Sequence, residues 1–343
     1  MSTSLDSCRA LVEDLRGART SRYYADAGLS AVVGWGLAAA ALHSSSLLPA
    51  SFAFLFASLL LYRALAFIHE LFHQQQLRIF RCMWHILVGV PLLLPLLLYL
   101  PIHQGHHSSS SYGTTRDGEY EQFFGRSLFM TWRLLLLNLA LPVALWIRFG
   151  LLTPLGMLVP AVRLKVTPSF VHLSLRMPYK APHIRGAAAK EAKWVELACM
   201  LWAWGLLSFV FIGYAQVAAI WAMLLIAIGM LNTVRALCST HLYVEHPEAR
   251  DALHQVADSL NIEGGGLLTQ LLCPVGLQYH ALHHLAPYLP YHALPEAHQR
   301  LMQALPTGSV YHQATVRSLF EGWGRLVQAT EANPSPCPSR SRD

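Results

Sequence analysis

Three clusters of histidine carry the chemistry that this sequence can offer. Within each cluster the histidines are three or four residues apart, or adjacent. They are His69 and His73 in HELFH, His103, His106 and His107 in HQGHH, and His280, His283 and His284 in HALHH. Residues three and four apart lie on one face of an α-helix, so each cluster would gather its imidazoles on one side. With His241, which follows a long apolar stretch, they predict a metal site.

The number and type of the candidate ligands limit how many metal ions are expected and which metals they are. HELFH alone is also the signature of a zinc protease with Glu70 as the base, but that assignment leaves two HxxHH clusters unexplained. A structural zinc ion needs four ligands and prefers some cysteine. Eight or nine imidazoles exceed what one ion can coordinate, which implies two ions, and imidazole suits iron and copper. His246 is a further open candidate, and the other histidines are expected to be ordinary.

The composition predicts a membrane protein. Hydrophobic residues make up 54% of the chain and charged residues only 13%, while the 18 histidines nearly equal the 19 acidic residues. A soluble domain carries about 25% charged residues, so a soluble enzyme, a disordered chain and a disulfide scaffold are excluded. The six cysteines form no CxxC pair and are expected to be reduced. We expect a lipid bilayer as partner, and no nucleic acid.

Two long uncharged stretches would cross the membrane twice each. Residues 27–62 and 197–234 contain no Asp, Glu, Lys or Arg, and each exceeds the roughly 20 residues of one span. Turns at 43–50 and 212–216 would divide them into hairpins. Basic residues gather near the N-terminus and in 163–193, which puts both termini and the latter segment in the cytoplasm. The predicted spans are about 27–44, 48–68, 195–212 and 216–238.

The arrangement of the histidines resembles that of the membrane fatty acid desaturase/hydroxylase superfamily, in its bacterial branch. Its signature is HxxxH, HxxHH and HxxHH at the cytoplasmic ends of four spans. The segments 112–120, 232–241 and 276–298 are similar to family segments as well, and the likeness covers roughly residues 25–305. It implies two iron ions with O2 as co-substrate, held by His69, His73, His103, His106, His107, His241, His280, His283 and His284.

The resemblance also sets the expected fold. It implies an all-α integral membrane protein with four transmembrane helices in two hairpins, interfacial or re-entrant helices, and a cytoplasmic cap with the di-iron site. Because all nine histidines must meet on one side, the apolar segments 82–102 and 134–162 cannot cross once, and Arg148 favours an interfacial position for the second. We expect a cytoplasmic segment at 1–26, the membrane domain at 27–330 and a disordered tail at 331–343.

Three residues after the second cluster are candidates to support the metal ligands. Asp117, Glu119 and Tyr120 lie in the family-like segment 112–120, and metal-bound histidines usually donate their second N–H to a carboxylate or carbonyl. One departure from the family is Glu70, where Asp is commoner.

The implied reaction is oxygen-dependent attack on a C–H bond of a fatty acid or acyl lipid at the inner membrane of a bacterium. Desaturation is the favoured outcome. Decarboxylation to a terminal 1-alkene, with Arg235 holding the free carboxylate, and hydroxylation are the alternatives. A separate ferredoxin, rubredoxin or cytochrome with its reductase would supply electrons. The basic segment 163–193 could dock this partner, but we favour the interpretation that its charges only set topology. A non-enzymatic alternative is a metal or proton transporter.

Overall fold

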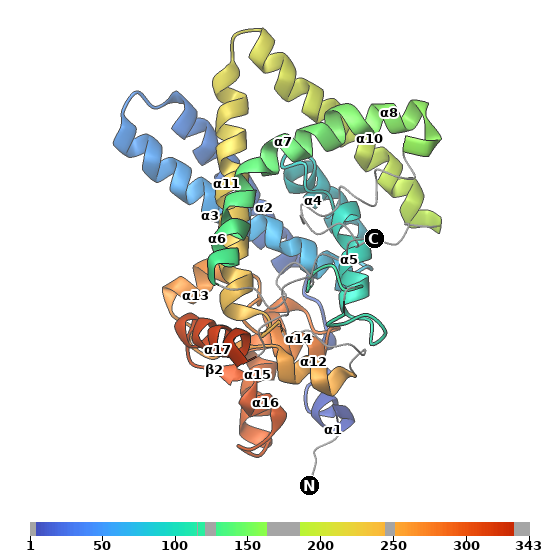
Figure 1. The fold of residues 1–343 in the computed structure, drawn as a ribbon, viewed down its shortest axis with the longest axis vertical. Helices are drawn as coiled ribbons and strands as arrows, with labels where there is room; N and C mark the ends of the chain where they lie inside the picture. The colour runs from blue at the N-terminus through green and yellow to red at the C-terminus, as the bar shows by residue number, and fades with distance from the viewer. Residues whose placement is uncertain (1–4, 115, 121–127, 163–185, 244–250, 333–343) are drawn as a thin grey trace, which may run out of the picture. The chain divides into compact units, whose positions relative to one another are not determined.

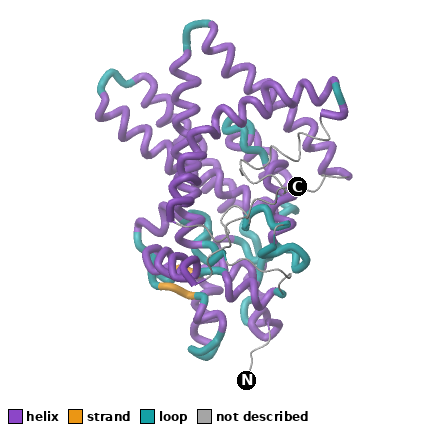
Figure 2. Tube along the Cα trace, in the orientation of Figure 1, coloured by secondary structure: helices purple, strands orange, loops and turns teal. Residues whose placement is uncertain are grey.

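The computed structural model describes residues 5–114, 116–120, 128–162, 186–243 and 251–332. These residues are mostly helical (Figure 2), as the sequence predicts. The chain divides into two units, which are described separately. We call Gly17–His103 with Leu136–Thr233 the long-helix unit, and Met1–Arg16, Gln104–Leu135 and Val234–Asp343 the loop-rich unit.

The long-helix unit is built from apolar helices and short π- and 3-10 segments (Figure 1). Three further helices begin in one unit and end in the other: α5 (Leu96–His106), α6 (Leu128–Leu137) and α11 (Ala215–Ser239). The elements wholly inside the unit are α2 (Thr20–His43), α3 (Leu47–His73), α4 (Arg78–Trp84), the π-helix η2 (His85–Gly89), η4 (Asn138–Ala140), α7 (Leu141–Trp146), the π-helix η5 (Ile147–Leu152), α8 (Thr153–Leu158) and α10 (Gly186–Phe211).

The loop-rich unit consists of short helices and one pair of two-residue parallel strands, the only named strands among the described residues. Its elements are α1 (Leu5–Ala10), η1 (Glu13–Arg16), α12 (Ala252–Asp258), β1 (Asn261–Ile262), α13 (Leu267–Leu272), α14 (His280–Leu285), η6 (Tyr291–Ala293), α15 (Leu294–Ala304), α16 (Val310–Gln313), β2 (Thr315–Val316) and α17 (Leu319–Ala332).

Five helical stretches in the described residues are long and apolar enough to cross a membrane. Four of them overlap the segments that the sequence predicts as spans, and the fifth was expected in the interface. An integral membrane protein is thereby confirmed, whereas the number of crossings and their direction remain predictions. The stretches are Thr20–His43, Leu47–His73, Trp132–Leu158, Ala189–Phe211 and Ala215–Ser239.

Helices α2 and α3 form a hairpin that is tied together by polar contacts at one end. Arg63 donates two hydrogen bonds to Asp26, at 2.7 and 2.5 Å, and both side chains are partly buried. An added Cβ at Gly34 would lie 2.9 Å from Cγ of Leu61, so the glycine permits the close approach of the two helices. Both helices extend beyond the uncharged stretch 27–62, and the pairing of Asp26 with Arg63 neutralises the charges that border this stretch.

The segment 82–102 is broken at its prolines. Residues between η2 and α5 form turns around Pro91 and Pro95, and Leu93 takes a positive φ of 54°. A proline cannot donate the backbone hydrogen bond that a helix requires. The freed carbonyl of Pro91 accepts hydrogen bonds of 2.8 Å from the indole N–H groups of both Trp202 and Trp221. This segment is not among the candidate spans, in agreement with the sequence.

The segment 134–162 differs from expectation in its continuity and in the place of Arg148. Trp132–Leu158 is one helical run, and Arg148 lies buried within it. Its guanidinium donates to Glu196 at 2.5 Å and to Thr153 at 2.6 Å. A buried charge is stabilised by a partner of opposite charge. Arg148 therefore does not need the membrane interface to satisfy its charge, and its presence no longer favours an interfacial position for this segment.

The core of the loop-rich unit surrounds α14, the helix of the third histidine cluster. Leu282 and Leu285 of α14 are buried together with Cys8 and Val12 from the N-terminal residues. Nε of Arg9 donates to the carbonyl oxygen of Leu285 at 2.9 Å, which satisfies an otherwise unpaired group at the C-terminal end of α14. Residues 5–16 thus help to hold this helix in place.

A glycine permits the contact between α17 and the last turn of α11. An added Cβ at Gly322 would overlap the carbonyl oxygen of Cys238. We expect Gly322→Ala to lower the free energy of unfolding by about 1–3 kcal/mol, the usual cost of overpacking, because neither backbone can move far. Thermal unfolding of the detergent-solubilised protein, compared with that of the wild type, measures this loss.

Gly324 provides the matched control for that substitution. It lies on the same helix, and an added Cβ would meet nothing within 4 Å. Gly324→Ala should be neutral or stabilising by up to about 1 kcal/mol, because alanine favours the helical state. Equal destabilisation by both variants would contradict the packing argument.

Candidate metal centre

In the long-helix unit, three of the predicted histidines lie close together. His69 and His73 occupy the last turns of α3, and His103 lies on α5. The Nε2 atoms of His73 and His103 are 2.9 Å apart, and the rings of His69 and His103 are 4.7 Å apart between centroids. Glu70 accepts a hydrogen bond of 2.5 Å from the hydroxyl of Tyr23. The buried Glu70 therefore supports the packing of α3 on α2, rather than acting as the free base of a protease.

In the loop-rich unit, four histidines converge on one point. Nε2 of His241 lies 3.1 Å from Nε2 of His106 and 2.8 Å from that of His280, which in turn lies 3.2 Å from Nε2 of His284. The four ligand atoms all lie within 4.8 Å of one another, and the side chains are buried. We call His106, His241, His280 and His284 the four-histidine cluster.

Two local structures bring these side chains together. His280 and His284 are four residues apart on α14, so their rings share a face of this helix. His241 is placed by backbone pairing: Leu242 N–H donates to the oxygen of Asp258 and Leu260 N–H donates to that of Thr240, at 2.9 and 2.8 Å. The sequence predicts the helical pair from spacing, whereas the position of His241 depends on contacts distant in the chain.

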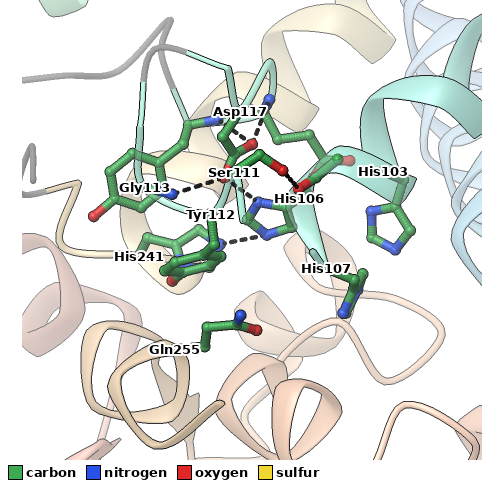
Figure 3. Close-up of polar contacts among 12 residues, drawn as sticks. His103, His106, His107, Ser111, Tyr112, Gly113, Asp117, His241 and Gln255 are labelled. Carbon is green, nitrogen blue, oxygen red and sulfur yellow. Dashed lines mark hydrogen bonds and ion pairs between the residues drawn. The ribbon is translucent and has the colours of Figure 1, made fainter. Parts of the chain in front are cut away.

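The second ring nitrogen of two cluster histidines, His106 and His284, faces a hydrogen-bond acceptor. Nδ1 of His106 lies 2.9 Å from a carboxylate oxygen of Asp117, and Nδ1 of His284 lies 3.2 Å from the amide oxygen of Gln255. Figure 3 shows Asp117 beside His106. A ring whose Nδ1 carries the proton keeps the lone pair of its Nε2 for a metal. These contacts leave the Nε2 atoms of both rings available to a metal ion.

His241 is oriented by a network of hydroxyl groups. Tyr112 and Tyr120 both donate to Oδ2 of Asp258, at 2.9 and 2.6 Å, and Ser259 donates to the backbone oxygen of Gln255 at 2.7 Å. The hydroxyl protons of Tyr112 and Ser259 are donated in these bonds, so toward His241 the two hydroxyl oxygens can only accept. Nδ1 of His241 lies 3.0 Å from the oxygen of Tyr112 and 3.1 Å from that of Ser259, and it therefore carries the proton. The network therefore leaves the lone pair of Nε2 of His241 available to a metal ion.

The electrostatics of the cluster favour a cation. Burial lowers the pKa of His241 and of His284 well below the usual 6.5, and neighbouring histidines add to the effect. These rings are neutral and hold a lone pair at neutral pH. Burial also opposes charge on His106, but Asp117 and Glu119 outweigh it and raise the pKa of His106 to about 9. Carboxylates that attract a proton to this ring would equally attract a metal cation.

The spacing of the donor atoms fits one metal ion. With metal–nitrogen bonds of about 2.1 Å, two ligands at right angles stand about 3.0 Å apart. The separations of 2.8–3.2 Å between the Nε2 atoms agree with this value. Neutral imidazoles are good ligands of iron, copper and zinc, so the four-histidine cluster can hold a first-row transition metal ion.

The remaining predicted site residues belong to the loop-rich unit. Nε2 of His107 is 3.0 Å from Nε2 of His283, and their rings are 4.8 Å apart. The backbone N–H of Glu119 donates to Asp117 at 3.1 Å, and Tyr120 reaches the cluster through Asp258. Arg235 is half-buried in the last turns of α11, and its role toward a substrate stays a prediction. His246 lies outside the described residues.

Sequence reasoning missed the residues that orient two of the cluster histidines. Tyr112, Gln255, Asp258 and Ser259 contact Nδ1 of His241 or of His284, or support the groups that do. Tyr112 lies in the family-like segment after the second cluster, which is the one signal that could have marked it. Asp258 ends the short helix α12 and carries no local signal.

The fold and the histidines define a class: a helical integral membrane protein with groups of histidines that could hold metal ions. Its sequence matches the family described as fatty acid desaturase over residues 19–315, and the chain belongs to that family. It is 36% identical over 334 residues to a curated protein named ceramide hydroxylase from Caulobacter vibrioides (strain NA1000 / CB15N), covering 93% of this chain and 92% of the relative.

Family membership confirms the resemblance that the histidine clusters indicated. It makes the protein a membrane oxidoreductase of the desaturase and hydroxylase type. The protease and transporter alternatives lose their support, because an oxidoreductase family accounts for all three clusters together.

Proposed function

We propose that this protein is an oxygen-dependent hydroxylase of ceramides. The observation that carries the proposal is the 36% identity to the ceramide hydroxylase, which extends over almost the whole of both chains. The sequence alone favoured desaturation. Hydroxylation is preferred here because the relative is named a hydroxylase, and no separate observation favours the loss of a second hydrogen, which desaturation would require.

The proposed cofactor is a pair of iron ions held by the nine histidines, one of them in the four-histidine cluster. When bound, they would supply the oxygen activation that attack on an unactivated C–H bond requires. The chain's own residues hold the ligands: Asp117 fixes His106, and Tyr112 with Ser259 fixes His241. All four rings of the cluster are at most 4% exposed, which keeps bulk water from the reacting centre.

The proposed substrate changes one earlier hypothesis. A ceramide carries its acyl chain as an amide and has no free carboxylate. A carboxylate-binding role for Arg235, which belonged to the decarboxylase alternative, is therefore not part of this proposal. The lipid would reach the metal centre from the bilayer, which we propose to be the inner membrane of a bacterium, with the centre on the cytoplasmic side.

The proposal also requires an external electron donor. A ferredoxin, rubredoxin or cytochrome with its reductase would supply the electrons. The basic segment 163–193 remains the proposed docking surface, and most of it lies outside the described residues. In the described part, Glu191 pairs with Arg81 at 2.9 Å, which leaves Lys190 and Lys193 as basic groups of α10 for such a partner.

Lipid analysis tests the proposed reaction. Membranes containing the wild-type protein, an electron-donor system and a defined ceramide are incubated under ¹⁸O2. We expect a product heavier by one oxygen atom that carries the isotope, located by fragmentation on one chain of the ceramide. The same preparation with His284→Ala should yield none.

Each other product would identify a different enzyme. A ceramide with an added double bond and no isotope would replace the hydroxylase by a desaturase. Volatile 1-alkenes from added free fatty acids would indicate a decarboxylase. Isotope found in free fatty acids or phospholipids, with ceramide unchanged, would keep hydroxylation and overturn the substrate.

A further inference from the structure

The segments that follow the parallel strands β1 and β2 leave this strand pair at the same end. Asn261 pairs with Thr315 and Ile262 with Val316, and the N–H of Glu263 donates to the oxygen of Val316. In a parallel pair both chains run in the same direction. The residues that follow β1 and β2, which lead into α13 and α17, therefore leave the pair together.

Both segments present large apolar side chains to the outside. The exposed fractions are 73% for Leu267, 50% for Leu268 and 36% for Leu271 on α13, and 77% for Phe320 at the start of α17. We call these four residues the leucine–phenylalanine patch. The sequence of α13, LLTQLL, contains no charged residue. Large apolar side chains exposed together in such a segment are typical of a contact surface.

The patch lies beside the last turn of a helix that is a candidate membrane span. Gly322, two residues after Phe320, packs against the carbonyl oxygen of Cys238 in α11. Cys273, directly after α13, is hydrogen-bonded with Ser239, the last residue of α11. Both segments are therefore fixed to the last turn of α11, a helix that is long and apolar enough to cross a membrane. Figure 1 shows α13 and α17 near this end of α11.

We propose that the leucine–phenylalanine patch inserts into the bilayer interface and that lipid is its occupant. The proposal rests on continuity: α13 and the start of α17, which carry the patch, are fixed to the last turn of α11, a helix long and apolar enough to cross a membrane. Short apolar helices without enough length to cross lie in the boundary between headgroups and acyl chains. This contact does not depend on the proposed reaction.

Fluorescence in a lipid nanodisc tests the depth of the patch. Leu268→Cys and Phe320→Cys are each labelled with an environment-sensitive dye, in a protein whose Cys82, Cys238 and Cys337 are serine. The discs contain phosphatidylethanolamine and phosphatidylglycerol, with or without a doxyl-labelled lipid. We expect blue-shifted emission at both positions, strong quenching by the doxyl lipid and little quenching by iodide in the buffer.

Gln313→Cys is the matched control for these labels. Gln313 is exposed in the same unit and lies before β2, whereas Phe320 lies after it, so the strand separates the two positions. Its dye should show water-like emission and respond to iodide. Water-like emission at 268 and 320 would overturn the proposal. Dyes shielded from both quenchers would also overturn it, because a protein rather than lipid would then cover the patch.

Discussion

Replacing His280 with alanine is expected to remove about half of the bound iron and to abolish product formation, if each of two ions has its own ligand group. Nε2 of His280 has two close neighbours in the four-histidine cluster, lying 2.8 Å from Nε2 of His241 and 3.2 Å from Nε2 of His284. Its loss removes one of the four imidazole ligands of this cluster. Elemental analysis of the purified protein gives the iron-to-protein ratio, and the isotope assay gives the activity.

His254→Ala is the matched control for that variant. His254 belongs to the same unit, but it is exposed and contacts Asp251 at 2.6 Å, away from the cluster. Both iron content and activity should remain at the wild-type level. If His280→Ala kept its full iron content, the four-histidine cluster would not be a metal site. Loss of all iron would show that the two ions bind as one cooperative unit.

Local spacing predicts part of the candidate site. The separation of four residues between His280 and His284 brings their Nε2 atoms together because one turn of helix α14 holds both. In the same way, the long uncharged stretches predict the hairpin helices, since length and hydropathy are properties of the sequence alone. Each of these predictions depends on residues close together in the chain.

The rest of the site depends on contacts between distant residues. Asp258 and Tyr112 are far apart in sequence and meet only in the folded unit, where 258–260 pairs with 240–242 and the hydroxyl of Tyr112 contacts both Asp258 and His241. No periodicity marks such a pair. The buried partner of Arg148 illustrates the same limit: Glu196 on α10 neutralises it, whereas the sequence showed an arginine interrupting an apolar run. Local patterns give the elements, and tertiary pairing decides the surroundings of a charge.

Asp258→Asn should weaken iron binding and activity by about 10- to 100-fold, the range found when partners of metal-bound histidines are changed. Oδ2 of Asp258 accepts both tyrosine hydroxyls and lies 3.8 Å from Nδ1 of His241. Asparagine keeps the shape but removes the negative charge, which in this buried setting offsets part of the charge of a bound cation. Competition with a chelator of known affinity measures the change.

A series of matched variants shows whether Asp258 orients the metal ligand His241 or only stabilises the fold. Asp251→Asn removes an exposed carboxylate that caps α12 by accepting from the N–H of His254, so it should affect stability slightly and iron affinity not at all. Tyr120→Phe removes the hydrogen bond of 2.6 Å from the Tyr120 hydroxyl to Oδ2 of Asp258 and keeps the carboxylate, so its effect should fall between those of the two aspartate variants. If Asp258→Asn unfolded at a lower temperature but bound iron as tightly as the wild type, Asp258 would support the fold alone. Reduced iron affinity at unchanged stability of the metal-free protein would identify it as the residue that positions His241 through Tyr112.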